Sequence, residues 1–149
     1  MASHAAAHVA EIIARKCAAQ NEVRVIFACA PSQTEFFAAL VSHPIEWANV
    51  TVFHMDEYLG LSADHPQSFR AYLREHLLRH ISVPRAVHLL AGDADPSEEC
   101  ARYAALLAAR PVDLVCLGIG ENGHLAFNDP PVADFDDPDC IKVVALDSA

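Results

Sequence analysis

The chain has 149 residues, a formal net charge of −10, 53% hydrophobic residues and 20% charged residues. This composition predicts one folded domain over residues 1–149 rather than a disordered chain. The negative charge argues against nucleic acid or an anionic membrane as the partner, because either would require a basic face.

Helical and strand patterns alternate along the chain. Apolar residues recur at helical spacing over 4–20, and the unbroken apolar run over 23–29 is typical of a strand buried on both faces. The alternation continues with helix 32–43, strand 49–55, helix 66–80, strand 86–90, helix 96–110, strand 112–118 and strand 141–146.

Start signals precede the three later helices. Ser32 opens an S-x-x-E capping box, Pro66 suits a first helical turn, and Asp95 stands before a proline. Strands alternating with helices predict an α/β fold with an open, mostly parallel sheet and helices on both faces. Ligands of such sheets bind beyond the carboxyl ends of the strands, so we expect functional side chains there.

Three glycines form a G-x-G-x-x-G pattern after strand 112–118: Gly118, Gly120 and Gly123. A dinucleotide fingerprint needs a helix that begins at the third glycine and holds the pyrophosphate. Two prolines follow within eight residues, and the motif lies on the fourth strand rather than the first. NAD binding is therefore not expected.

The same loop carries a histidine among polar residues. His124 can move protons near neutral pH, and Asn122 and Asp129 could orient its ring and fix its tautomer. The glycines would let the backbone turn sharply and approach a ligand. From composition alone, an ordinary loop histidine beside an Asn-Asp-Pro turn explains the pattern equally well.

Two further strand ends carry polar residues. Asp56 and Glu57 follow strand 49–55, where partial burial would raise the pKa of a carboxyl toward that of a useful base; a solvated acidic turn is the commoner case. Adjacent strand residues point to opposite faces, so only one would face a given pocket unless the chain turns. Ser32 and Gln33 open a helix whose free N–H groups either bind phosphate or are simply capped.

No metal site is expected. His76 and His80 stand four residues apart on one predicted helix, but the sequence offers no evident third ligand. Five scattered cysteines, no signal-peptide pattern and no membrane-spanning run predict a reduced, cytoplasmic protein.

Three motifs occur in a familiar order: HMDEYLGL at 54–61, HPQSF at 65–69 and LGIGENGHLAFNDP at 117–130. Together they resemble the glucosamine-6-phosphate deaminase (isomerase) family, whose superfamily includes 6-phosphogluconolactonase, over nearly the whole chain. The resemblance implies a Rossmann-like fold. It also implies an enzyme that converts glucosamine-6-phosphate to fructose-6-phosphate and ammonia without metal or organic cofactor.

The resemblance implies four catalytic residues. Asp56 would be the base that moves a proton between C2 and C1, and His124 would assist opening of the sugar ring. Asp129, where the family often has a glutamate, would orient His124. Asn122 takes the place of an aspartate found in some members, and an amide can orient an imidazole but stabilises its cation less well.

Five substrate-binding residues are implied in the same way: Ser32, Gln33, Glu57, Gly120 and Gly123. Ser32 and the amides beyond it would contact the phosphate, because Pro31 replaces part of the family's usual glycine-rich loop and lacks an N–H donor. Glu57 would support the sugar or the loop.

The chain stops just after a predicted strand, whereas relatives continue and supply a basic residue for the phosphate. We therefore expect an N-terminal part of such a protein, with the activity of this part left open. The alternatives are a lactonase of the superfamily and a non-catalytic sugar-phosphate sensor; Asn122 and the altered phosphate loop favour the sensor, and MDEY favours the deaminase. The expected partner is a small sugar phosphate, with a homo-oligomer as a further possibility.

Overall fold

The computed structural model describes residues 1–146 and contains one sheet of four parallel strands. The strands lie in the order β3-β2-β1-β4 and comprise β1 (Val23–Phe27), β2 (Val50–His54), β3 (Ala86–His88) and β4 (Leu114–Cys116). The open, parallel α/β sheet predicted from the sequence is therefore confirmed.

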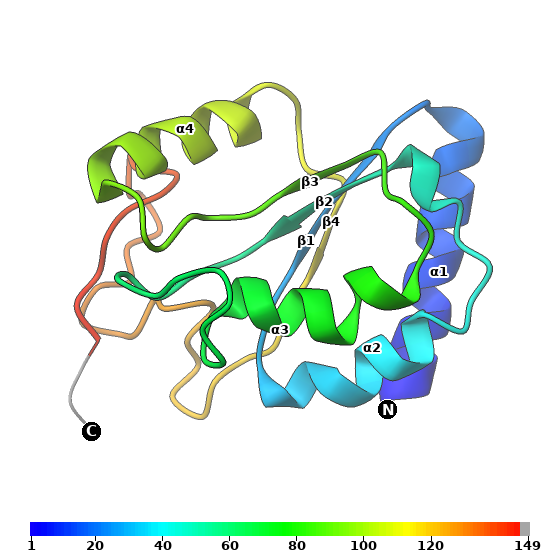
Figure 1. Ribbon diagram of the computed structural model, residues 1–149, viewed down its shortest axis with the longest axis horizontal. Coiled ribbons are helices and arrows are strands. Elements are labelled where there is room, and N and C mark those ends of the chain that lie inside the picture. Colours follow the sequence, from blue (N-terminus) through cyan, green and yellow to red (C-terminus); the bar gives the residue numbers. More distant parts are fainter. Residues whose placement is uncertain (147–149) are drawn as a thin grey trace.

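Helices cover both faces of this sheet, as predicted. They are α1 (Ala2–Ala19), α2 (Thr34–Leu40), α3 (Phe69–His76) and α4 (Pro96–Ala108). Figure 1 shows α4 on one side of the sheet and α1, α2 and α3 on the other. None of the helices within residues 1–146 combines the length and apolar character that crossing a membrane requires.

Alternate residues of the buried strands supply the two halves of the core. Val25 and Phe27 of β1 pack in one cluster with Phe37 of α2, whose ring centroid lies 5.7 Å from that of Phe27. On the opposite face, the Arg24 guanidinium donates to the carbonyls of two residues of α4 and lies 4.8 Å from the centroid of the Phe53 ring. Because both faces are covered, the strands read as apolar runs without alternation.

The structure corrects the predicted starts of two helices. Ser32 lies in a 3₁₀ turn (Pro31–Gln33) ahead of α2, and no side chain caps α2, so the predicted capping box does not form. Helix α3 begins after Ser68, whose hydroxyl accepts from two main-chain amides, and Pro66 lies outside the helix. The sequence contained two start signals for this helix. Ser68 prevails because a serine is a better N-cap than the residue that precedes Pro66.

Helix α3 also ends earlier than predicted, at His76, and a separate 3₁₀ turn (Leu78–His80) follows. The start of α4 is as predicted: the Asp95 carboxylate accepts from the amides of Ser97 and Glu98, both at 3.0 Å. An N-cap signal that adjoins its helix is local, and so it can be read from the sequence.

The predicted strand at 141–146 is wrong. Ile141 lies at a bend, residues 142–146 have no regular secondary structure, and no strand within residues 1–146 pairs with them. Instead, the Lys142 ammonium donates to the Val132 carbonyl at 3.0 Å and pairs with Asp137. These contacts hold the segment over the carboxyl ends of the strands, beside α4. A short apolar run in the sequence can therefore form the wall of a cavity as well as a strand.

The strand order reverses direction between β1 and β4. From β1 the chain passes to β2 and β3 on one side, and then crosses to β4 on the other side of β1. Such a switch point opens a crevice at the carboxyl ends of the strands, where ligands of α/β sheets bind. The ends of β1, β2 and β4, which carry the predicted site residues, therefore meet at one edge of the sheet.

Candidate active site

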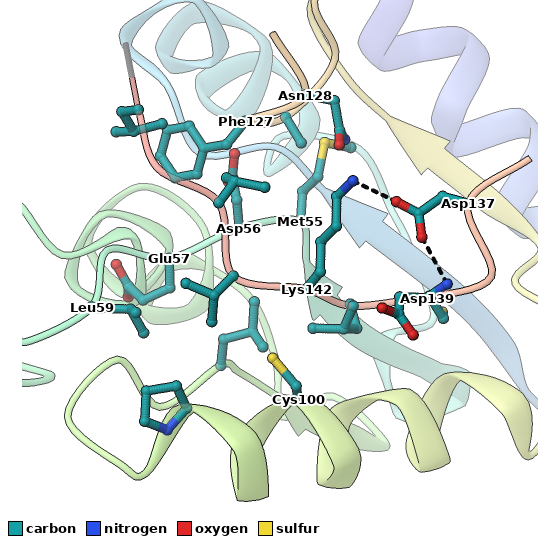
Figure 2. A pocket seen from close by; sticks show the side chains of 18 of the residues that line it. Met55, Asp56, Glu57, Leu59, Cys100, Phe127, Asn128, Asp137, Asp139 and Lys142 are labelled. Atoms are coloured by element: carbon teal, nitrogen blue, oxygen red, sulfur yellow. Dashed lines mark hydrogen bonds and ion pairs between the residues drawn. The ribbon is translucent and has the colours of Figure 1, made fainter. Parts of the chain in front are cut away.

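A cavity of about 670 Å³ lies beyond the carboxyl ends of the strands. Its walls come from the residues that follow β2 and β3, the start of α4, the loop after β4 and the segment 133–146. Figure 2 shows Asp56 inside this cavity, with Phe127 to one side and Asn128 and Lys142 to the other.

Asp56 is the most strongly perturbed carboxyl of the cavity. Burial, followed by the nearby negative charge of Glu57, raises the pKa of Asp56 from 3.8 to about 7. Both effects penalise the ionised form, because the carboxylate is taken from water and placed beside a like charge. A carboxyl with this pKa exchanges its proton easily near neutral pH.

Glu57 also lines the cavity, but its carboxylate is turned toward α3. Its Oε1 accepts from the amides of Tyr58 (3.0 Å) and Phe69 (2.9 Å), and its Oε2 accepts from the Ser68 hydroxyl (2.8 Å) and the Arg70 amide (2.9 Å). The chain turns after β2, so both adjacent carboxyls line the cavity, and they point in different directions (Figure 2). Glu57 thus caps the N-terminus of α3.

The loop after β4 brings Asn122, His124 and Asp129 together. The amide nitrogen of Asn122 donates to Asp129 at 2.8 Å, which directs the amide oxygen toward Nδ1 of His124 at 2.6 Å. Nδ1 also lies 3.2 Å from Asp129 Oδ1. Two acceptors around Nδ1 place the ring hydrogen there, so Nε2 is left with its lone pair.

Two glycines make this arrangement sterically possible. A Cβ added to Gly120 would lie 2.2 to 2.5 Å from three ring atoms of His124, so only glycine leaves room for the ring. Gly123 has a φ of +88°, in the left-handed region that glycine adopts without strain. The glycines of the G-x-G-x-x-G pattern therefore shape a polar loop, and no helix follows them within residues 124–146.

The turn after β1 lies against the start of this loop. Atoms of Ser32 and Gln33 are 3.7 and 3.5 Å from the position of a Cβ on Gly118. The Tyr72 hydroxyl of α3 donates to the Ala30 carbonyl at 2.7 Å and so fixes the turn. The three strand ends named by the sequence are therefore neighbours in space.

The predicted site residues nevertheless divide into two groups. Asp56, Glu57 and Gly123 line the cavity, whereas the remaining six lie outside its lining: Ser32, Gln33, Gly120, Asn122, His124 and Asp129. The side chain of His124 is 36% exposed. The structure therefore places the histidine cluster outside the cavity lining, on the same loop as the lining residues Gly123 and 125–128.

Several residues at this site were not expected from the sequence. Tyr58, Phe69 and Phe127 form an aromatic cluster with ring centroids 5.1 to 5.7 Å apart, which joins the loop after β2 to the loop after β4. Arg70 and Asp93 form an ion pair at 2.9 Å beneath the Glu57 carboxylate. Ser68 in HPQSF, a good N-cap before an apolar run, was the one local signal of this arrangement.

Acidic residues outnumber basic ones in the cavity lining. Within residues 1–146, Lys142 is the one basic lining residue, and the acidic ones are Asp56, Glu57, Glu99, Asp134, Asp137 and Asp139. Three of these carboxylates are paired: Glu57 with Arg70, Glu99 with Arg102 and Asp137 with Lys142. Within residues 1–146, no three His, Cys, Asp or Glu side chains are arranged to hold a metal ion. The lining therefore favours a ligand group with a positive charge.

The curated proteins that this chain resembles are glucosamine-6-phosphate deaminases. A glucosamine-6-phosphate deaminase of Lactobacillus delbrueckii subsp. bulgaricus is 38% identical over 66% of this chain and 42% of its own length. One from Exiguobacterium sp. is 46% identical over 60% of this chain and 35% of its own length. The chain thus spans less than half the length of these curated relatives.

Solved structures agree with this likeness. A structure described as a monomeric glucosamine-6-phosphate deaminase superposes with a TM-score of 0.87 at 29% identity, covering 99% of this chain and 61% of that one. A 6-phosphogluconolactonase from Thermotoga maritima shares the fold, with a TM-score of 0.77 at 20% identity over 84% of this chain and 58% of that one.

A family comparison covers almost the whole chain. Residues 1–143 match the family described as glucosamine-6-phosphate isomerases/6-phosphogluconolactonase. The parallel sheet, its switch point and the polar loops at its strand ends agree with that match. The chain therefore belongs to the glucosamine-6-phosphate isomerase/6-phosphogluconolactonase family.

Proposed function

We propose that the protein isomerises and deaminates an amino-sugar phosphate, converting glucosamine-6-phosphate and water to fructose-6-phosphate and ammonia. Water hydrolyses the C2 imine that the proton shift produces, which releases the ammonia. The observation that carries the proposal is Asp56, a carboxyl with a pKa of about 7 in the cavity at the strand ends. An aldose–ketose shift needs one group that takes a proton from C2 and returns it to C1. A base whose pKa lies near the working pH performs both steps efficiently.

His124 is proposed to assist opening of the sugar ring. Its Nδ1 hydrogen is directed to Asn122 and Asp129, at 2.6 and 3.2 Å, which leaves Nε2 free to accept the proton of the C1 hydroxyl and to pass it to the ring oxygen as the bond between C1 and that oxygen breaks. Asp129 supplies the negative charge that stabilises the imidazolium formed in this step. Asn122 orients the ring through its amide without adding charge.

The charge of the cavity supports an amino sugar as the substrate. Asp56, Asp134 and Asp139 line the cavity without a basic partner within residues 1–146 and attract the ammonium group at C2, whereas a sugar lactone carries no such positive charge. A phosphate is better placed outside this lining, at the turn that holds Ser32 and Gln33. This turn adjoins the start of the His124 loop and offers the amide and hydroxyl of Ser32, whereas the amides of Gln33 and Thr34 already donate to carbonyls of the turn.

The proposed partner is a free sugar phosphate in the cytoplasm, acted on without metal or organic cofactor. The five cysteines are free thiols, which suits a reducing compartment, and the net charge of −10 disfavours nucleic acid. Whether the protein forms a homo-oligomer stays a prediction that light scattering would check.

A coupled ammonia-release assay with glucosamine-6-phosphate tests the function. We expect turnover in the unmodified chain, loss of at least about a hundredfold in Asp56→Asn, and retention in the matched control Asp64→Asn, whose side chain is 92% exposed. Hydrolysis of 6-phosphogluconolactone without ammonia release would identify a lactonase instead. Saturable sugar-phosphate binding with neither reaction would identify a sensor, and either result would overturn the proposal.

A further inference from the structure

We propose that Glu57 is a positioning residue for Asp56 rather than a ligand of the sugar. Its buried carboxylate, together with Ser68, Arg70 and Asp93, fixes the loop that carries Asp56 and keeps a negative charge beside it. The inference deepens the proposed function and rests on it, because it assumes that Asp56 is the base.

The Glu57 carboxylate has no free capacity to bind a sugar hydroxyl. Its side chain is 2% exposed, and each of its two oxygens already accepts two hydrogen bonds, at 2.8 to 3.0 Å. Two carboxylate oxygens offer about four lone-pair sites in total. A hydroxyl donor could join only by displacing one of these four donors, which would leave a main-chain amide or the Ser68 hydroxyl without this partner.

Arg70 extends this arrangement to the loop after β3. Its Nε lies 3.4 Å from Glu57 Oε2, an ion-pair distance, and its Nη2 donates to the Leu61 carbonyl at 2.6 Å and pairs with Asp93 at 2.9 Å. The Gly60 amide adds a hydrogen bond of 2.6 Å to the Gly92 carbonyl. The loop that begins at Asp56 is therefore tied to α3 and to the end of β3.

The same carboxylate acts on Asp56 through its charge. After burial, Glu57 is the further cause that raises the pKa of Asp56. Other titratable or charged groups face the cavity or lie near Asp56: Cys29 beyond β1, Glu99 on α4, and Asp134, Asp137, Asp139 and Lys142 in the segment 133–146. The causes of the raised pKa of Asp56 are burial and Glu57, so removal of Glu57 alone should lower this pKa.

Carbon-13 NMR titration of the aspartate carboxyls tests this coupling without any turnover. The Asp56 signal is assigned by its loss in Asp56→Asn. In Glu57→Gln we expect its midpoint to fall by about 1 pH unit from about 7. The matched control is Glu99→Gln, the same substitution in the same cavity, which should leave the midpoint within about 0.2. An unchanged midpoint in Glu57→Gln, or equal shifts in both variants, would overturn the inference.

Kinetics separate positioning from sugar binding. In Glu57→Gln we expect kcat to fall and the acidic limb of its pH profile to move down with the Asp56 midpoint, while KM stays within about twofold. A tenfold rise in KM with kcat unchanged would make Glu57 a sugar ligand and refute the assignment. If no form of the protein releases ammonia, the proposed function fails, and the titration still decides whether Glu57 and Asp56 are coupled.

A second variant covers the case in which Glu57→Gln does not fold. Asp93→Asn removes a negative charge from the far side of Arg70, where the Asp93 side chain is 49% exposed and its loss is better tolerated. Arg70 then offsets more of the Glu57 charge, so the Asp56 midpoint should again fall, by a smaller amount. A midpoint unchanged within error would contradict the proposal.

Discussion

Replacing Asp56 by asparagine should stabilise the folded chain at neutral pH while removing the proposed base. The pKa of Asp56 is raised from 3.8 to about 7 in the folded state, by burial and then by Glu57. Between these two values the unfolded chain releases a proton that the folded chain keeps. Stability is therefore lost as pH rises through this window and is constant above it. The asparagine side chain of the variant has no group to ionise, so the variant escapes this loss.

The size of the effect follows from the two pKa values. A change from 3.8 to about 7 corresponds, at about 1.4 kcal/mol per pH unit, to about 4 kcal/mol for the whole window. Over an experimental range of pH 4.5 to 8.5, about 3 kcal/mol of this should be observed. The two proteins should have similar free energies of unfolding at the acidic end and diverge toward neutral pH.

Urea unfolding of both proteins at several pH values measures this difference, with m-values compared to confirm that the same surface is exposed. The other carboxyls titrate in both proteins, so their contributions cancel in the difference between the two free energies of unfolding. The control is Asp64→Asn, whose exposed side chain should give a difference that varies by less than about 0.5 kcal/mol over the range. If the Asp56→Asn difference were equally flat, Asp56 would not titrate near pH 7 and the argument for a base would be lost.

Two further predictions concern the loop after β4 and the start of α4. Gly120→Ala should displace the His124 ring and lower ammonia release at least about tenfold, with less than about 1 kcal/mol lost in urea unfolding; Gly118→Ala, whose nearest neighbours lie at 3.5 Å and beyond, should retain activity. Equal activity in both variants would show that the ring position is unimportant. Asp95→Ala should lower the free energy of unfolding by about 1 kcal/mol through loss of the α4 cap, and an unchanged urea midpoint would contradict this.

Part of the candidate site could be read from the sequence because its residues lie close together in the chain. The expected contact among Asn122, His124 and Asp129 is present, since eight residues are enough to form a loop that turns back on itself. The strand ends were also identifiable, because an apolar run that stops at MDEY marks where a buried strand meets the ligand edge. The catalytic roles of these residues stay predictions.

Other features depend on partners far away in the chain. Glu57 could be read as a sugar ligand because nothing in MDEY shows that Ser68 and Arg70 will turn back to occupy its oxygens. The segment 141–146 has the composition of a strand, but strand formation requires a neighbour with free main-chain groups, and this segment covers the cavity instead.

The alternation of strands and helices, the parallel sheet and the polar strand ends could all be derived from the order of the amino acids. Hydrophobic periodicity and capping signals act within a few residues, so they can be recognised in the sequence. The burial of Asp56 in an acidic cavity, and the turning of Glu57 away from that cavity to cap α3, became visible only in the folded chain. Burial and charge at a site are sums over all the segments that fold around it, and no single stretch of sequence contains them.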